Sequence, residues 1–432
     1  MFNIAGGFLH NHFYMPKYDR VVVTGLGTIT SLGNNVKDSW NGLVNGVSGA
    51  DDIKSFDTSK FKTRFACQVK NFDPLQYLEK KDVKKMDVYT QLALAASDEA
   101  MQDAGFVNNN YDPDRFGVIF SSGIGGFVSF EEECFNYALN NKTPRFSPFF
   151  VPKIICDIGA GYISIRYGLR GPNFAVVSAC ASSNNSIIEA LYHLRLNKAD
   201  AILCGGSEAG VAQGAVGGFS SMKALSERND DPKTASRPYD KDRDGFVIGE
   251  AAGVLILERL DHAVKRGARI YAELAGGGAS ADAYHITAPH PEGLGAKKVM
   301  LAALDDADMQ ASDIDYVNTH GTSTPLGDLA EIKAIVDVFG DHSKRINISS
   351  TKSMTGHCLG AAGAVEAIAS IKSIQEGVVP PTINHFTDDP DFDADLNFTF
   401  NKAQPRKIRA ALSNNFGFGG HNASLIFKEY IP

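Results

Sequence analysis

Three side chains have types and settings that suit nucleophilic and acid–base chemistry, and the first is Cys180. It follows the apolar run FAVVSA and precedes a helical pattern, CASSNNSIIEALYHL. A cysteine at a helix N-terminus lies near the positive end of the helix dipole, which favours the thiolate. Backbone N–H groups at the same place can hold an oxyanion. We therefore predict that Cys180 is a nucleophile, although a buried, inert cysteine would fit most such positions.

The other two side chains are His320 and His357. His320 lies in YVNTHGTSTPLGD, at the C-terminal end of an apolar strand, where ligands approach α/β sheets. His357 lies in STKSMTGHCLGAAGA, directly before a helix rich in glycine and alanine. Either histidine alone would more often be structural, but two of them together with a helix-cap cysteine form a more specific set. No ligand pair at short spacing accompanies them, so we expect no metal.

Two charged residues and one glycine-rich segment lie near this set. Lys352 comes five residues before His357, and Glu331 lies on the helix that follows His320. A Lys–Glu pair could orient the histidines, and a purely structural ion pair is equally consistent with the pattern. The segment FGFGGHN, residues 416–422, suits either a mobile gate or a simple glycine turn.

These residues are spread over alternating strand and helix patterns. The runs RVVVTGLG, FGVIFSSG, FAVVSA, ADAILCGG, AAGVLILE, YVNTHG, INISST and ASLIF read as strands. Helical patterns between them predict layered α/β architecture with buried, largely parallel strands. We expect an N-terminal extension at 1–19, a half at 20–267 that carries Cys180, and a half at 268–432 that carries both histidines.

A weak internal repeat supports two similar halves. Cys180 and His357 each follow a strand or turn and open a helix, and they are 177 residues apart. At the same offset Glu189 matches Glu366, and Ala190 matches Ala367. We infer that two helix N-termini of similar setting face one site.

Composition excludes several other classes of protein. The 432 residues carry a net charge of −8, which argues against a nucleic-acid binder. No apolar run is long enough to span a membrane, and the first twenty residues do not read as a secretory signal. Six cysteines without a CxxC pair fit reduced thiols in a cytoplasmic protein. Residues 1–14 show no periodicity, so we expect a chain that begins at Met15 to fold.

Six longer motifs carry a family resemblance. They are SACAS around Cys180, RPYDKDRDGFVIGEAAG at 237–253, SADAYHITAPHPEG at 280–293, NTHGTSTPLGD at 318–328, STKSMTGHCLGAAGAVEA at 350–367 and NNFGFGGHNASLIF at 414–427. With them the chain, from about residue 20 to 428, resembles the elongating type II β-ketoacyl-acyl-carrier-protein synthases of bacterial fatty acid synthesis. The Cys–His–His set separates it from initiating synthases, which carry Cys–His–Asn, and from chain-length-factor subunits, which lack the cysteine.

The resemblance implies a fold, a reaction and partners. The fold would be a thiolase-like, five-layered α-β-α-β-α sandwich of two similar halves in a homodimer. The reaction would join an acyl thioester to malonyl-acyl carrier protein with loss of CO₂. Acyl carrier protein would bring both substrates on its phosphopantetheine arm, and no cofactor, nucleic acid or membrane would take part.

The resemblance also implies a role for each matching residue. Cys180 would accept the acyl group, His320 and His357 would act on the malonyl thioester, and Lys352 would pair with Glu331. The backbone N–H groups of Cys180 and Phe418 would form the oxyanion hole, with Phe418 as the gate. The substrate-binding residues would be Thr287, Thr322 and Thr324 along the phosphopantetheine channel, and Ile124 and Phe219 in the acyl pocket.

Some features depart from the family or stay open. Asn415 and His421 stand where many relatives carry Ser or Thr, and Ala251 replaces a common glycine. A ketosynthase of a dedicated polyketide or aryl-polyene pathway, a cysteine hydrolase and a non-catalytic acyl-binding subunit remain alternatives. Because the chain and most carrier proteins are both acidic, docking should use a basic patch. The candidates by position are Lys60, Lys62, Arg64, Lys223 and Arg228.

Overall fold

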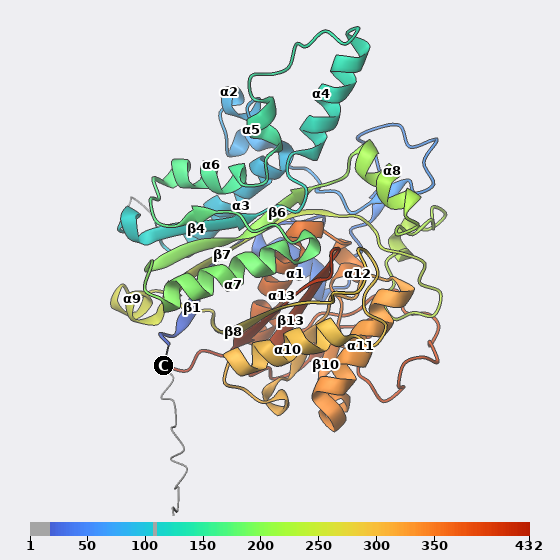
Figure 1. The fold of residues 1–432 in the computed structure, drawn as a ribbon. Helices are drawn as coiled ribbons and strands as arrows, with labels where there is room; N and C mark the ends of the chain where they lie inside the picture. Colours follow the sequence, from blue (N-terminus) through green and yellow to red (C-terminus); the bar gives the residue numbers. More distant parts are fainter. Residues whose placement is uncertain (1–17, 107–109) are drawn as a thin grey trace, which may run out of the picture.

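The structure is a computed structural model that describes residues 18–106 and 110–432. Ten of its strands form one mixed sheet (Figure 1). In spatial order they are β10 (Asn347–Ser349), β9 (Tyr316–Asn318), β13 (Ala410–Gly417), β14 (His421–Lys428), β8 (Ala272–Ala281), β1 (Val21–Ile29), β7 (Glu250–Arg259), β6 (Ala201–Ala209), β4 (Phe116–Ser121) and β5 (Asn173–Phe174). Of the predicted extension at 1–19, residues 1–17 lie outside the described part of the chain. Residues 1–14 and Met15, on which the prediction about a shorter chain depends, therefore lie outside it as well.

The sheet is parallel only at its two ends. β10, β9 and β13 run parallel to one another, and so do β6, β4 and β5. The central pairs from β13 to β6 are all antiparallel. The prediction of largely parallel strands is therefore wrong for the centre. A tight turn joins β13 to β14, and such short connections can join only antiparallel neighbours.

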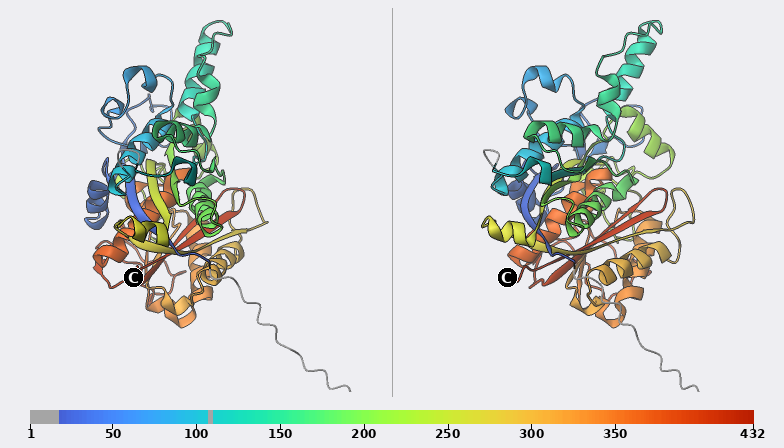
Figure 2. Two further views of the ribbon diagram at one scale, coloured as in Figure 1. Left: turned by 90° about the vertical axis from the view of Figure 1, so that its left-hand side faces the viewer. Right: turned by 60° about the vertical axis from the view of Figure 1, so that its left-hand side comes forward.

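β1 and β8 have the fewest paired residues of any two neighbouring strands in the centre of the sheet, because only residues 21–23 lie opposite residues 272–274. Helices α7 (Ser182–Arg195) and α13 (Ala362–Glu376) pack against strands from both sides of this contact in one apolar cluster. Helices α3 (Val88–Asp103) and α6 (Ile158–Tyr167) cover β4, β6 and β7, whereas α10 (Leu294–Asp306) and α11 (Pro325–Phe339) cover β9, β13 and β14 (Figure 2).

Further elements connect this framework. They are α1 (Val36–Val44), β2 (Asp51–Asp52), β3 (Phe65–Ala66), α2 (Lys80–Val83), α4 (Phe127–Leu139), α5 (Phe150–Ile154), α8 (Gln213–Ser221), α9 (Leu260–Lys265), α12 (Lys352–Thr355), β11 (Val378–Val379) and β12 (Gln404–Pro405). Within residues 18–106 and 110–432, none of the helices combines the length and apolar character that crossing a membrane requires.

The internal repeat exists, but at another offset. A short 3₁₀ helix, η3 (Ala179–Ala181), leads into α7, and η7 (Leu359–Ala361) leads into α13. Each begins at a non-glycine residue with positive φ, 51° at Ala179 and 47° at Leu359. The two units are thus related by an offset of 180, and the predicted offset of 177 is wrong by three residues. Cys180 corresponds to Gly360, while His357 lies in the turn before η7.

Two strands of the ten-stranded sheet were missed, and one was predicted too long. β8 contains three glycines and β13 two asparagines, residues of low strand propensity, so neither reads as a strand in isolation. Their long pairings with β14 hold them in the sheet. The FAVVSA run forms only the end of the two-residue β5, because the chain then leaves the sheet to reach η3.

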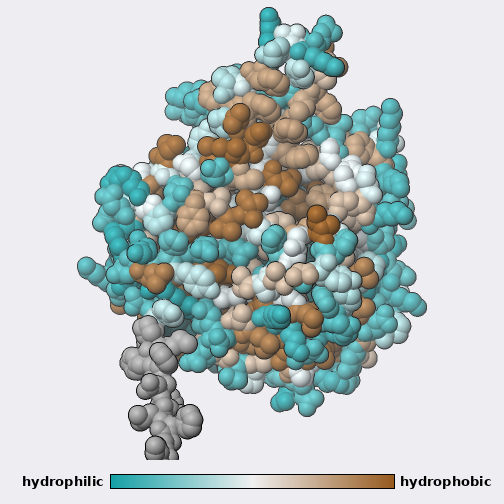
Figure 3. Space-filling view, viewed as in Figure 1, coloured by the Kyte–Doolittle hydropathy of each residue, from teal (hydrophilic) through white to brown (hydrophobic). Residues whose placement is uncertain are grey.

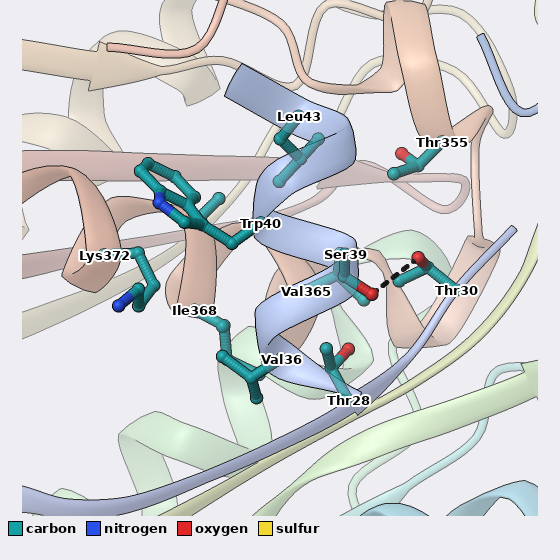
Figure 4. Close-up of a pocket in the computed structure, with 11 residues that line it drawn as sticks. Thr28, Thr30, Val36, Ser39, Trp40, Leu43, Thr355, Val365, Ile368 and Lys372 are labelled. Atoms are coloured by element: carbon teal, nitrogen blue, oxygen red, sulfur yellow. Dashed lines mark hydrogen bonds between the residues drawn. The ribbon is translucent and has the colours of Figure 1, made fainter. Parts of the chain in front are cut away.

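Helix α1 follows β1 in the chain and packs against helix α13 (Figure 4). The Thr30 hydroxyl bonds that of Ser39 at 3.0 Å, and the indole N–H of Trp40 donates to Glu376 at 2.8 Å. A cavity of about 10 Å³ remains between Trp40, Leu43 and the facing residues of α13. That volume is no larger than a single water needs, so it is a packing gap and not a ligand site.

Candidate active site

The structure brings Cys180, His320 and His357 together. The Nε2 atom of His357 lies 3.0 Å from the Sγ atom of Cys180. The two histidine rings are 5.2 Å apart and nearly perpendicular. Cys180 comes from η3, His320 from the loop after β9 and His357 from the turn between α12 and η7. All three line one cavity of about 600 Å³.

Burial decides the resting state of the thiol. Desolvation raises the pKa of Cys180 to about 12, although Lys352 and the backbone N–H groups of Phe418 and Cys180 lower it. The predicted resting thiolate at the helix N-terminus is therefore not supported, because desolvation outweighs the local positive field. Cys180 rests as a thiol, and the nearest acceptor for its proton is His357.

The same backbone N–H groups define a site for an oxyanion. Both lower the pKa of the Cys180 thiol and so lie close to Sγ, one from Cys180 itself and one from Phe418. Phe418 lies in the turn between β13 and β14, followed by Gly419 at φ 88° and Gly420 at φ 73°. Glycine adopts positive φ more readily than other residues do, which explains the two glycines at 419 and 420. The N–H of Gly419 donates to the carbonyl of Ile286, so this turn contacts the 282–290 loop.

Both histidines are neutral near pH 7. Burial lowers the pKa of His320 and of His357 well below the ordinary value, and the positive charge of Lys352 adds to the effect. A neutral imidazole carries one N–H and one acceptor nitrogen. Each ring can therefore donate one hydrogen bond or accept one proton, depending on its tautomer.

Lys352 pairs with Glu366, and the predicted pairing with Glu331 is wrong. The Lys352 ammonium contacts the Glu366 carboxylate, and both side chains are fully buried. Glu331 instead accepts the backbone N–H groups of His320 at 2.9 Å and Gly321 at 2.8 Å. Sequence proximity to the histidine could not distinguish a carboxylate that binds backbone from one that binds lysine.

The structure shows three further polar residues that sequence reasoning missed as site residues. Asn415 donates to Glu366 at 2.8 Å and contacts His320 Nδ1 at 3.4 Å. Glu208 accepts the N–H groups of Gly123 and Gly360, which joins the 122–125 turn to η7. Two of the three could have been found from the sequence: Asn415 departs from the residue common in the family, and Glu366 matches Glu189 in the internal repeat. Nothing in the segment GGSEAG indicated a role for Glu208, the third.

Most of the predicted binding residues line the cavity. Thr287, Thr322, Thr324 and Phe219 are part of its wall, as is Lys223. Ile124 is not part of this wall. It packs with Phe219 in the neighbouring apolar cluster, next to Leu359. Across the described chain, no three His, Cys, Asp or Glu side chains are grouped in a way that could hold a metal ion.

Comparisons with known proteins agree with this geometry. The family model "Beta-ketoacyl synthase, N-terminal domain" matches residues 18–263, and "Beta-ketoacyl synthase, C-terminal domain" matches residues 271–386. The chain is 48% identical over 417 residues to the 3-oxoacyl-[acyl-carrier-protein] synthase 2 of Staphylococcus aureus strain N315. The match covers 96% of this chain and 100% of the relative.

Solved structures of ketosynthases share the fold. A beta-ketoacyl synthase from Burkholderia phymatum STM815 is similar at a TM-score of 0.89 and 34% identity, over 96% of this chain and 100% of the other. A chain of the AntDE:AntF complex, a type II PKS acyl-carrier protein with its ketosynthase, is similar at 0.88 and 33%, with the same coverage. The mixed α/β fold is thus a ketosynthase fold, and the chain belongs to the beta-ketoacyl synthase family.

Proposed function

We propose that this protein catalyses the condensation step of fatty acid elongation. It would join an acyl group held on Cys180 to malonyl-acyl carrier protein, giving 3-oxoacyl-acyl carrier protein and CO₂. The observation that carries the proposal is the contact between Cys180 Sγ and His357 Nε2, with His320 beside it in the same cavity. The relative that is 48% identical is a 3-oxoacyl-[acyl-carrier-protein] synthase.

The first half-reaction moves the acyl group to the enzyme. His357 takes the proton of the Cys180 thiol, and the sulfur attacks the thioester carbonyl of the acyl-carrier protein. The N–H groups of Cys180 and Phe418 stabilise the tetrahedral oxyanion. The bond to the pantetheine sulfur breaks, and the leaving thiolate takes the proton back from His357.

The second half-reaction forms the carbon–carbon bond. Malonyl-carrier protein loses CO₂, and the negative charge passes to its thioester oxygen as an enolate. Neutral His320 can donate an N–H to that oxygen, and His357 can do so once its single proton is on Nε2, the nitrogen that faces Cys180. The enolate carbon then attacks the Cys180 thioester and the carbon–sulfur bond breaks. The Cys180 thiolate takes up a proton from solvent, which is the one proton that the overall reaction consumes.

The cavity also supports a carrier-protein partner. Thr287, Thr322 and Thr324 offer hydroxyls along the cavity wall, which suits a phosphopantetheine arm. Lys223 is exposed at that wall, and the other candidate docking residues are exposed or half-buried: Lys60, Lys62, Arg64 and Arg228. We propose that these cations attract the acidic carrier protein.

Charge reversal tests this docking surface. Lys223→Glu with Arg228→Glu should weaken the use of carrier-protein substrates, mainly by raising KM, because association loses its electrostatic attraction. Short pantetheine thioesters should react at nearly the unmodified rate. Lys407→Glu, which lies outside the cavity, is the control. An equal loss with both substrate types would show that these residues support folding or the cavity itself and not the docking of the carrier protein.

We also propose a homodimer with a thiolase-like, five-layered subunit. The halves would be 20–267 and 268–432, with α7 and α13 as the central layer. The edge strand β5 and exposed apolar side chains near it, among them Ile165 and Val177, support a partner on this face. Figure 3 shows apolar side chains gathered over the region of α4 to α7. Light scattering coupled to size exclusion would measure the mass.

A ketosynthase of a dedicated polyketide pathway is the second candidate. It is favoured by the similarity to the ketosynthase of a type II PKS complex. The deciding experiment is an elongation assay with acyl- and malonyl-carrier proteins over a series of chain lengths. Repeated elongation of saturated acyl chains supports fatty acid synthesis, whereas acceptance of only unreduced or unsaturated chains supports the dedicated pathway. Release of free acid without condensation would contradict both.

A further inference from the structure

Asn415 connects His320 to the buried ion pair. It lies on β13 two residues beyond Ser413, which pairs with Asn318 of the parallel strand β9, so Asn415 is level with His320. Its Nδ2 atom is 2.8 Å from Glu366 Oε2 and 3.4 Å from His320 Nδ1. The side chain is fully buried.

The surroundings decide which end of the amide faces the histidine. Glu366 is held by the Lys352 ammonium, and a carboxylate oxygen accepts only from a donor. A rotated amide would place Asn415 Oδ1 against that carboxylate and lose the bond. In the observed orientation Oδ1 lies over Gly363 and has no hydrogen-bond partner in the described parts of the chain. The two NH₂ contacts therefore fix the amide, although one buried acceptor stays unpaired.

This orientation has a consequence for the ring of His320. Because the amide N–H groups face Nδ1, that nitrogen must be the acceptor. Burial keeps the ring neutral near pH 7, so its single proton is then on Nε2. Nε2 forms no hydrogen bond with any residue in the described ranges, and His320 lines the cavity.

We propose that Asn415 is a positioning residue that holds His320 in the Nε2–H tautomer. The ring then presents a ready donor to the thioester oxygen of the malonyl group. The proposal rests on the proposed function for its catalytic meaning, but the tautomer itself is a property of the free enzyme. The bond of 3.4 Å is long, as catalytic hydrogen bonds often are before substrate binds.

Replacement of Asn415 should separate the two half-reactions. In Asn415→Ala, release of CO₂ from malonyl-carrier protein should fall about 10- to 100-fold, as it does for partners that orient metal-bound histidines. Acylation of Cys180, followed by mass spectrometry, should stay within about twofold, because the thiol contacts His357 and not His320.

Asn184→Ala is the matched control. Asn184 is equally buried, and its Oδ1 atom contacts the same glycine, Gly363, without bonding to His320 or Glu366. This variant should keep both half-reactions. Both asparagines contact Gly363, but only Asn415 contacts His320. If the two variants lost the same share of CO₂ release, the loss would come from packing at Gly363, and the proposal would be contradicted.

The tautomer can be measured without any substrate. Nitrogen NMR of protein labelled with ¹⁵N-histidine, with His320→Gln to identify the signals, should show Nδ1 unprotonated and Nε2 protonated near pH 7. Asn415→Ala should shift His320 toward a mixture. A wild-type Nδ1–H tautomer, or an unchanged tautomer in the variant, would overturn the proposal even if Asn415→Ala folds poorly. If the tautomer is as expected but wild type releases no CO₂, the proposed function fails and the positioning role stands.

Discussion

Burial sets the chemistry of the site at the scale of single residues. It keeps Cys180 as a thiol and both histidines neutral. A neutral pair suits donation to a developing oxyanion, and a thiol needs a neighbouring base before it can attack. The contact between Cys180 and His357 supplies that base.

The buried Lys352–Glu366 pair should be important for stability when one partner is removed. Glu366→Gln leaves the Lys352 charge without a carboxylate, which in comparable buried pairs costs about 3–5 kcal/mol. Urea unfolding would measure the loss. Asp337→Asn, which breaks the exposed pair with Lys297, is the control and should cost less than about 1 kcal/mol. Equal costs for the two variants would show that burial does not matter here.

The sequence predicted the reactive residues better than their supports. Cys180, His320 and His357 stand at the ends of recognisable patterns, and the structure brings all three together. Two buried carboxylates, Glu331 and Glu366, could have paired with Lys352. The loop after β9 presents its backbone N–H groups to Glu331, so Glu366 is the one that pairs with Lys352. No local pattern encodes such a choice.

At the scale of elements, two strand–turn–helix units place the chemistry. Ala179 and Leu359 adopt positive φ, so each chain turns sharply into its 3₁₀ helix. Strong apolar periodicity made α7 and α13 predictable, whereas the glycines of β8 and the asparagines of β13 hid strands that tertiary pairing forms. The antiparallel pairing at the centre of the sheet was likewise not predictable, because it depends on how the strands are connected, and the sequence does not show where β8 and β13 begin and end.

Helix α1 offers a test of how the elements are held together. Trp40 packs α1 on α13 and donates to Glu376. Trp40→Ala removes a large buried side chain, so the free energy of unfolding should fall by about 3–5 kcal/mol. Urea unfolding followed by far-UV circular dichroism would measure it, with the exposed Leu75→Ala as control. A loss below about 1 kcal/mol would contradict the packing described for α1.

At the scale of the whole molecule, four buried carboxyls couple stability to pH. Burial raises the pKa of Glu99, Glu208, Glu250 and Glu331 to about 7. Each folded carboxyl holds a proton that the unfolded chain loses near its ordinary pKa of 4.5. The stability from each is complete below about pH 4.5 and is lost as the pH rises through 7.

We therefore expect the free energy of unfolding to fall as the pH rises from 6.5 to 8. Each group can contribute a slope of at most about 1.4 kcal/mol per pH unit. His320 and His357 act in the opposite sense, because the unfolded chain protonates them near their ordinary pKa of 6.5, so their contribution is largest at the lower end of this window and fades as the pH rises. Urea unfolding at three pH values would measure the slope, and Glu99→Gln should reduce it. A constant or rising stability would show that these carboxyls are ionised when folded.

The central claim is that Cys180 carries the acyl group while His320 and His357 act on the malonyl group. The most direct measurement combines mass spectrometry of the acylated enzyme with CO₂ release from malonyl-carrier protein. Cys180→Ala should take up no acyl group and form no product, yet still release CO₂. His320→Ala should acylate and lose CO₂ release, with each histidine donor worth about 3–4 kcal/mol in that transition state. Normal acylation of Cys180→Ala, or wild-type CO₂ release by both His320→Ala and His357→Ala, would contradict the account.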